Sequence, residues 1–162
     1  MKDCIDIITL ESKGICCINY FDRLNLDVLD LPEWRALMKK MLTATNTVEA
    51  IAYSQTKRRG GVIPDNYSAM WACTISTMEE VVSTTEETEY VKSRTVYAEG
   101  ADLLRITMEN FTKRVDFADL GEDEYARLLD CFENLMDTIK ALLDTQKAHA
   151  GERPKGLRVV KY

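Results

Sequence analysis

A run of basic residues followed by two glycines is the part of this chain best suited to chemistry. Lys57-Arg58-Arg59-Gly60-Gly61 is a candidate anion-binding loop, because guanidinium groups pair with phosphate in a fork geometry and glycine lets backbone amides approach closely. The Gly-x-x-x-x-Gly-Lys-Ser/Thr order of a Walker loop is absent. A solvated loop that is basic without binding phosphate is the simpler interpretation of the same residues, and we favour it.

The other reactive side chains do not form a recognisable catalytic or metal-binding pattern. The only histidine, His149, falls near the end of an expected helix, where a cation suits the helix dipole, and any Ser-His-Asp or Cys-His arrangement would have to use it. A metal site needs several converging ligands, which one histidine and five scattered cysteines do not supply, so we expect none. The odd number of cysteines, without a Cys-x-x-Cys pair, indicates reduced thiols.

Composition limits the class of protein and of partner. At 162 residues the chain is about one domain by size, and 46% hydrophobic with 30% charged residues is an ordinary globular composition. A formal net charge of -6 argues against nucleic acid as a partner, because phosphate binding needs clustered Lys and Arg. No stretch reaches the roughly 18 consecutive apolar residues that cross a bilayer, so we expect a cytoplasmic protein that does not enter a membrane.

The first 66 residues are predicted to form a ββαβ unit. Two β-type runs, 5–10 and 15–21, are joined by a turn at Gly14 and predict a hairpin. A helix is predicted to start at Leu31-Pro32-Glu33, with one buried stripe, and to end within 43–47. A third strand is then predicted over 48–53. The stripe of that helix consists of Trp34, Leu37, Met38, Met41 and Leu42.

The rest of the chain is predicted to be mostly helical. A short helix over 67–73 precedes polar material, and two long amphipathic helices follow over 87–111 and 122–148. We expect one α/β domain over 1–162, made of the ββαβ unit (1–66), a helical part (67–150) and a basic tail (151–162) with a terminal strand over 157–162. The tail holds four Lys or Arg against one acid, and a solvated terminus is its simplest interpretation.

The order of the first elements resembles the opening unit of a known family. Residues 11–20 look like its first hairpin, and Asp22-Arg23-Leu24-Asn25-Leu26 is similar to the link before its helix. Residues 48–53 and 61–67 look like the following strand and loop, in a variant form without the usual Ala-Gly-x-Asp. Together, residues 4–71 resemble the crotonase superfamily, the enoyl-CoA hydratase/isomerase-like proteins.

The resemblance implies a fold of repeated ββα units that binds an acyl-coenzyme A thioester. Two backbone N–H groups of that family hold the thioester oxygen as it becomes an enolate, and the resemblance gives the loop at Gly61 or Val62 as the source of the first donor here. The family's second, Gly-Gly-rich donor turn does not occur after Gly61, so whether the chain is an active lyase or isomerase stays open. The residues expected to contact the coenzyme A ligand are Arg23, Lys57, Arg58, Arg59 and Trp71.

A second hypothesis comes from the long helices alone. A non-catalytic α/β interaction or regulatory module would dimerise or dock a protein partner through helices 87–111 and 122–148. The apolar stripe between Tyr125 and Leu143 is its main support. The sequence leaves the acyl group, the reaction and the oligomeric state open.

Overall fold

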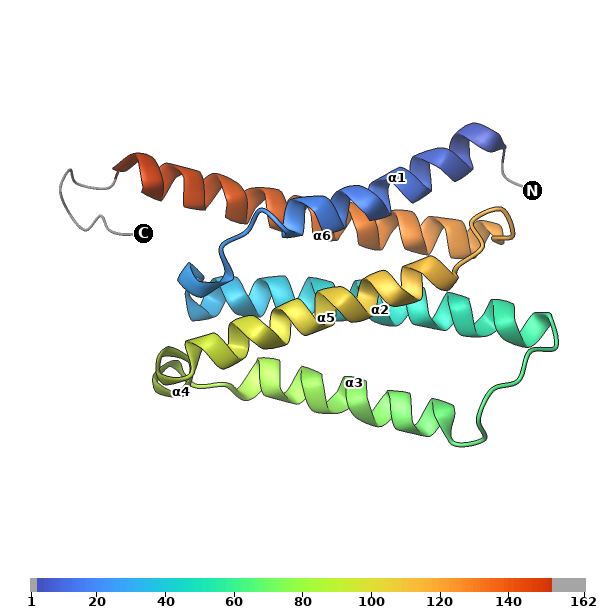
Figure 1. Cartoon of the computed structure of the whole chain (residues 1–162), viewed down its shortest axis with the longest axis horizontal. Coiled ribbons are helices and arrows are strands. Elements are labelled where there is room, and N and C mark those ends of the chain that lie inside the picture. Colours follow the sequence, from blue (N-terminus) through green and yellow to red (C-terminus); the bar gives the residue numbers. More distant parts are fainter. Residues whose placement is uncertain (1–2, 153–162) are drawn as a thin grey trace.

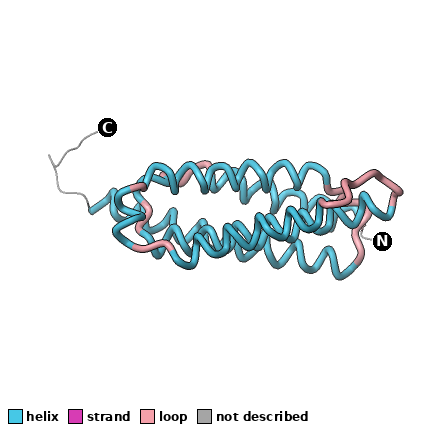
Figure 2. Tube along the Cα trace, turned by 90° about the horizontal axis from the view of Figure 1, so that it is seen from below, coloured by secondary structure: helices cyan, strands magenta, loops and turns pink. Residues whose placement is uncertain are grey.

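The described part of the protein is built from helices. A computed structural model describes residues 3–152, and no strand occurs in that range (Figure 1). The helices run along one long axis, and the loops gather at its two ends (Figure 2). The elements are α1 (Cys4–Phe21), η1 (Leu26–Val28), α2 (Leu31–Arg58), α3 (Tyr67–Thr84), α4 (Glu87–Lys92), α5 (Arg94–Arg114) and α6 (Glu122–Glu152).

The predicted N-terminal hairpin is wrong, because residues 4–21 form the single helix α1. Asp3 caps this helix by accepting a hydrogen bond from the Asp6 amide at 2.8 Å. Gly14 lies inside the helix rather than in a turn, and a Cβ built on it would lie 3.1 Å from the Phe132 ring. The glycine therefore lets α1 approach α6 closely. The buried residues follow a helical period of three and four: Leu10, Gly14, Cys17, Ile18 and Phe21.

The predicted third strand is also wrong, because residues 48–53 continue helix α2. The threonines that were expected to end the helix lie inside it and form hydrogen bonds with its backbone. The hydroxyl groups of Thr43, Thr45 and Thr47 each donate to the carbonyl four residues earlier, at 3.0, 2.7 and 2.8 Å. The predicted start at Leu31-Pro32-Glu33 is confirmed, with a capping box between Asp30 and Glu33 and with the predicted stripe buried.

The helical half differs from its prediction in detail. The helix predicted over 67–73 continues as α3 to Thr84, and the one predicted over 87–111 is broken at Ser93 into α4 and α5. Helix α6 begins at Glu122, as predicted. The strand predicted over 157–162 and the tail from 153 lie outside the described residues. With helices in place of the strands, the α/β, crotonase-like fold is wrong.

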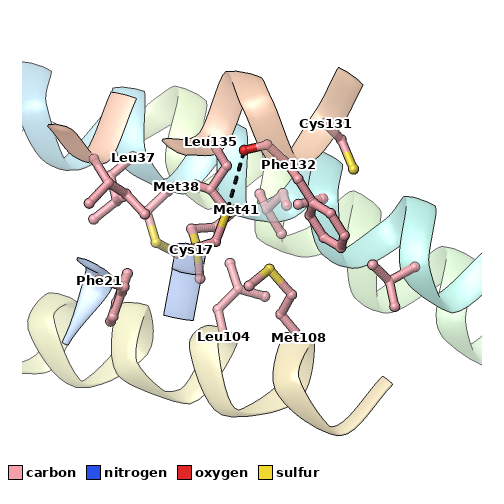
Figure 3. Close-up of a cluster of buried hydrophobic side chains, with 14 of the residues drawn as sticks. Cys17, Phe21, Leu37, Met38, Met41, Leu104, Met108, Cys131, Phe132 and Leu135 are labelled. Atoms are coloured by element: carbon pink, nitrogen blue, oxygen red, sulfur yellow. Dashed lines mark hydrogen bonds between the residues drawn. The ribbon is translucent and has the colours of Figure 1, made fainter. Parts of the chain in front are cut away.

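The core lies where α1, α2, α5 and α6 meet (Figure 3). Helix α2 is central, since it packs against α6, α5 and α3, while α1 packs mainly on α6. The Cys17 thiol of α1 donates a hydrogen bond to the Phe132 carbonyl of α6 at 3.2 Å. The apolar stripe of α6 faces this core, with Leu128, Leu135 and Ile139 fully buried. That stripe is therefore used inside the chain, and the interaction hypothesis loses its main support.

Candidate functional site

The basic segment 57–59, at the C-terminal end of α2, contacts the connection between α5 and α6. Arg59 contacts Asp116 at 2.8 Å and Asp119 at 2.9 Å, and Arg58 contacts Glu124 at 3.1 Å. The hydrogen bond from Arg59 holds the pKa of the Asp116 carboxyl below its ordinary value. Two of the three guanidinium groups predicted to contact coenzyme A, those of Arg58 and Arg59, therefore already have carboxylate partners in their own chain.

The predicted oxyanion donors lie in the same loop, and one of them is occupied. The Gly61 amide donates to the Thr56 carbonyl at 2.9 Å, and a Cβ on Gly61 would lie 2.6 Å from the Thr56 methyl group. Gly60 has a φ of 73°, which favours glycine. Val62 follows with its side chain 96% exposed. This turn is thus a helix C-terminus closed by backbone hydrogen bonds rather than a pair of free N–H donors.

The other predicted ligand-binding residues lie elsewhere. The Arg23 guanidinium stacks over the Tyr20 ring at 4.4 Å, in the segment before α2. Lys57 lies at the far end of that helix, with its ammonium group 5.7 Å from the centre of the Tyr53 ring. Helix α2 has 28 residues, so Arg23 and Lys57 lie at opposite ends of the bundle (Figure 1). Trp71 donates to the Asn46 side chain at 2.8 Å and packs edge-on against Phe111. No single site unites these residues.

A surface groove lies at the other end of the bundle, between η1 and α5. Its volume is about 660 Å³. Leu103 is 63% exposed and Ile106 is 41% exposed, although both are large apolar residues. They share one face of α5 with Val96 and Glu99, at a spacing of three and four residues. The groove is lined by Leu24, Asn25, Leu26, Asp27, Thr95, Ala98, Glu99, Asp102, Leu103 and Ile106.

The charged residues of the groove lining are all acidic. Asp27, Glu99 and Asp102 line it, and none of the three forms a salt bridge with another described residue. On the η1 side, the Arg94 guanidinium donates to the Asp27 backbone carbonyl at 3.4 Å. Arg105, about three turns further along α5, is bound to Asp22 and Glu109. The groove is therefore apolar at its centre and negative at its rim.

Sequence analysis missed this groove, although part of its signal was present. The helix predicted over 87–111 is amphipathic, and its buried face includes Leu104 and Met108. A second apolar series, Val96, Leu103 and Ile106, follows another face of the same helix. The contribution of η1 had no such signal, because Asn25 is placed by reciprocal hydrogen bonds to Gln146 of α6, at 3.2 and 2.9 Å.

A smaller cavity of about 180 Å³ lies beside the basic segment, between α2, α5 and the first turn of α3. Glu49 and Tyr67 line it, and the Tyr67 hydroxyl forms a hydrogen bond with the Glu49 carboxylate. Burial raises the pKa of Glu49 above its ordinary value, and this hydrogen bond offsets part of the rise. Val62 belongs to the lining, so one predicted residue does lie at a cavity.

Two of the five thiols are chemically quiet. Burial raises the pKa of Cys17 and of Cys131 to about 12, so neither is a thiolate near neutral pH. Within residues 3–152 no group of three or more His, Cys, Asp or Glu side chains is arranged to hold a metal ion. No helix in the same range has the length and apolar content needed to cross a membrane.

Comparison with known proteins adds no relative to this picture. No protein family, no curated protein and no solved structure matches the chain. The function is therefore argued from the groove and the cavity themselves.

Proposed function

We propose that this protein is a helical interaction module whose groove between η1 and α5 docks a basic amphipathic helix of a protein partner. The observation that carries the proposal is the exposed pair Leu103 and Ile106, set in a groove whose charged lining residues are all acidic. Exposed apolar surface rimmed by polar groups is typical of protein-binding sites. The acyl-CoA hypothesis is not carried further, because its ββαβ fold is replaced by helices.

The dimensions suit a helix as the ligand. From Val96 to Ile106 the exposed face of α5 extends over ten intervals of about 1.5 Å, or roughly 15 Å, which is nearly three turns of a docked helix. A partner helix would place apolar residues at i, i+3 and i+7 on Leu103 and Ile106. Lys or Arg residues beside that stripe would then lie near Asp27, Glu99 and Asp102.

The charge of the rim favours a different protein over a second copy of this chain. In a symmetric dimer through this groove, the acids of one copy would face those of the other, and like charges at an interface disfavour binding. A basic helix gains from the same three carboxylates, which no lysine or arginine of the described chain neutralises by a salt bridge. We also propose a cytoplasmic location, which the free thiols of the five cysteines support.

The proposal is tested with a synthetic probe. An amphipathic Leu/Lys peptide of about 14 residues, or roughly four turns, is titrated against the protein by fluorescence anisotropy, with a Leu/Glu peptide of the same pattern as its control. We expect the Leu/Lys peptide to bind and the Leu/Glu peptide not to bind. Replacing Glu99→Gln together with Asp102→Asn should weaken binding and flatten its dependence on salt.

Matched variants distinguish the groove from other exposed apolar surface. The pair Leu103→Ala and Ile106→Ala should weaken the Leu/Lys peptide by about tenfold or more, as expected for central anchors. The control pair Ile8→Ala and Ile15→Ala removes residues that are 56% and 59% exposed on α1, and it should leave affinity unchanged. The proposal would be overturned if both pairs of substitutions weakened peptide binding equally. It would also be overturned if the protein formed dimers without peptide and the variant with Leu103→Ala and Ile106→Ala did not.

A further inference from the structure

The cavity beside α3 combines a buried acid with an unpaired cation. Glu49 is 5% exposed, and within the described residues it has no salt bridge. Arg114, on the last turn of α5, lines the same cavity and has no salt bridge to a described residue either; its guanidinium lies 5.3 Å from the centre of the Phe111 ring. The neighbouring Arg58 and Arg59, by contrast, are both paired with acids.

The walls between these two charges are apolar and aromatic. The rings of Tyr53 and Tyr67 are stacked with centroids 5.6 Å apart, and Phe111 closes the side formed by α5. Val62 and its neighbours in the loop form the remaining wall. The Tyr67 hydroxyl is bonded to Glu49, so it holds the carboxylate in place at the cavity. The arrangement offers an anion and a cation at one small, largely apolar site.

From this geometry we infer that the cavity binds a small zwitterion, an α-amino acid with an aliphatic side chain. Its ammonium group would pair with Glu49 and its carboxylate with Arg114, while its side chain would lie against Phe111 and Val62. The volume of about 180 Å³ is suited to such a ligand, since a protein cavity of about 150 Å³ holds one benzene molecule.

An amino acid complements the cavity better than an amine or a carboxylate alone. A buried carboxylate is stabilised by a bound cation, because burial without a counter-charge is costly. A simple amine would satisfy Glu49 but would bring a second positive charge beside Arg114. A simple carboxylate would satisfy Arg114 but would bring a second negative charge beside Glu49. Only a ligand with both charges complements both side chains.

The experiment compares three ligands of nearly the same shape. L-Leucine, isopentylamine and 4-methylpentanoate are titrated by calorimetry and by thermal shift, because a ligand that binds the folded state raises its melting temperature. We expect L-leucine to bind at least tenfold more tightly than the other two. No binding of L-leucine, or equal or tighter binding of the amine or the carboxylate, would overturn the inference.

Variants assign the two ends of the ligand. Glu49→Gln and Arg114→Met should each weaken L-leucine binding by about tenfold or more, whereas Arg114→Met should strengthen isopentylamine binding because it removes a like charge. Tyr67→Phe, which keeps the ring and removes the hydroxyl, is a second and independent probe of the Glu49 end. Arg59→Gln removes a nearby cation outside the cavity and should leave L-leucine binding unchanged. Loss of L-leucine binding in Arg59→Gln, or its retention in Arg114→Met, would contradict the assignment.

Discussion

The connection between α5 and α6 is held mainly by one buried amide, and Gln55→Ala tests this. Gln55 is 2% exposed, and its side chain donates to the carbonyls of Asp116 and Asp119 at 2.9 and 2.7 Å and accepts from the Asp116 amide at 2.9 Å. At about 1 kcal/mol for each of three hydrogen bonds, the substitution should lower the free energy of unfolding by about 3 kcal/mol. For a domain of this size that is roughly 6–12 °C in melting temperature.

The salt bridges at the same connection should contribute less. Arg59 binds Asp116 and Asp119 through side chains that are about half exposed, where water screens the charges and the side chains lose entropy. The two variants, Gln55→Ala and Arg59→Ala, are compared by urea unfolding monitored with far-UV circular dichroism. A larger loss of stability in Arg59→Ala than in Gln55→Ala would refute this ranking.

A third variant separates hydrogen bonding from packing. Gln55→Met retains most of the side-chain volume and removes all three hydrogen bonds, so it should destabilise the protein nearly as much as Gln55→Ala. If Gln55→Met is as stable as the wild type, the loss of stability in Gln55→Ala came from the cavity left by the smaller side chain. The hydrogen bonds would then contribute little.

Three further outcomes follow from the same structure. Gly100→Ala should stabilise the protein by about 0.5–1 kcal/mol, since no atom lies near the new methyl group. Gly14→Leu should destabilise it by about 1–3 kcal/mol, because the new side chain would clash with the Phe132 ring. Urea unfolding measures both. The raised pKa of Glu49 in the folded state means that its ionised carboxylate destabilises the fold above that pKa. Glu49→Gln should therefore stabilise the protein at pH 8, and this gain should vanish as the pH falls from the raised pKa to the ordinary one. A gain that does not depend on pH would contradict this. Thiol titration with Ellman's reagent should find fast reaction only at the exposed cysteines in the folded protein, and rapid reaction of all five would contradict the burial; the exposed three are Cys4, Cys16 and Cys73.

The long helices could be predicted because their patterns extend over several turns. The stripe from Trp34 to Leu42 and the start of α6 at Glu122 both agree with the structure. The strands were predicted from short runs, where Ile and Val fit a strand and a buried helix face equally well. Over 4–21 the helical period from Leu10 to Phe21 competes with Gly14, which also fits the turn of a hairpin. Its partner, Phe132, lies in α6 and was not predictable from local sequence.

Residues 43–47 show a second limit of local rules. Threonine has a modest helix propensity, so several close together predict an end to the helix. In the structure they lie within α2, whose following turns bury Val48, Ile51 and Gln55. Packing of those turns against α5 and α6 outweighs the propensity, because most helix stability in proteins comes from tertiary contact.

The candidate sites depend on contacts between distant segments, and this decides what the sequence could reveal about them. The basic segment 57–59 does mark a structured region at the end of α2, but its arginines form salt bridges with acids some sixty residues later in the chain. Glu49 gave no local signal, since it lies in what looked like a strand and becomes notable only once α3 and α5 bury it. A charged residue in sequence predicts function only after its partners are known. The groove and the cavity are the better candidates because five of their charged residues form no salt bridge with any residue of the range 3–152: Asp27, Glu99, Asp102, Glu49 and Arg114.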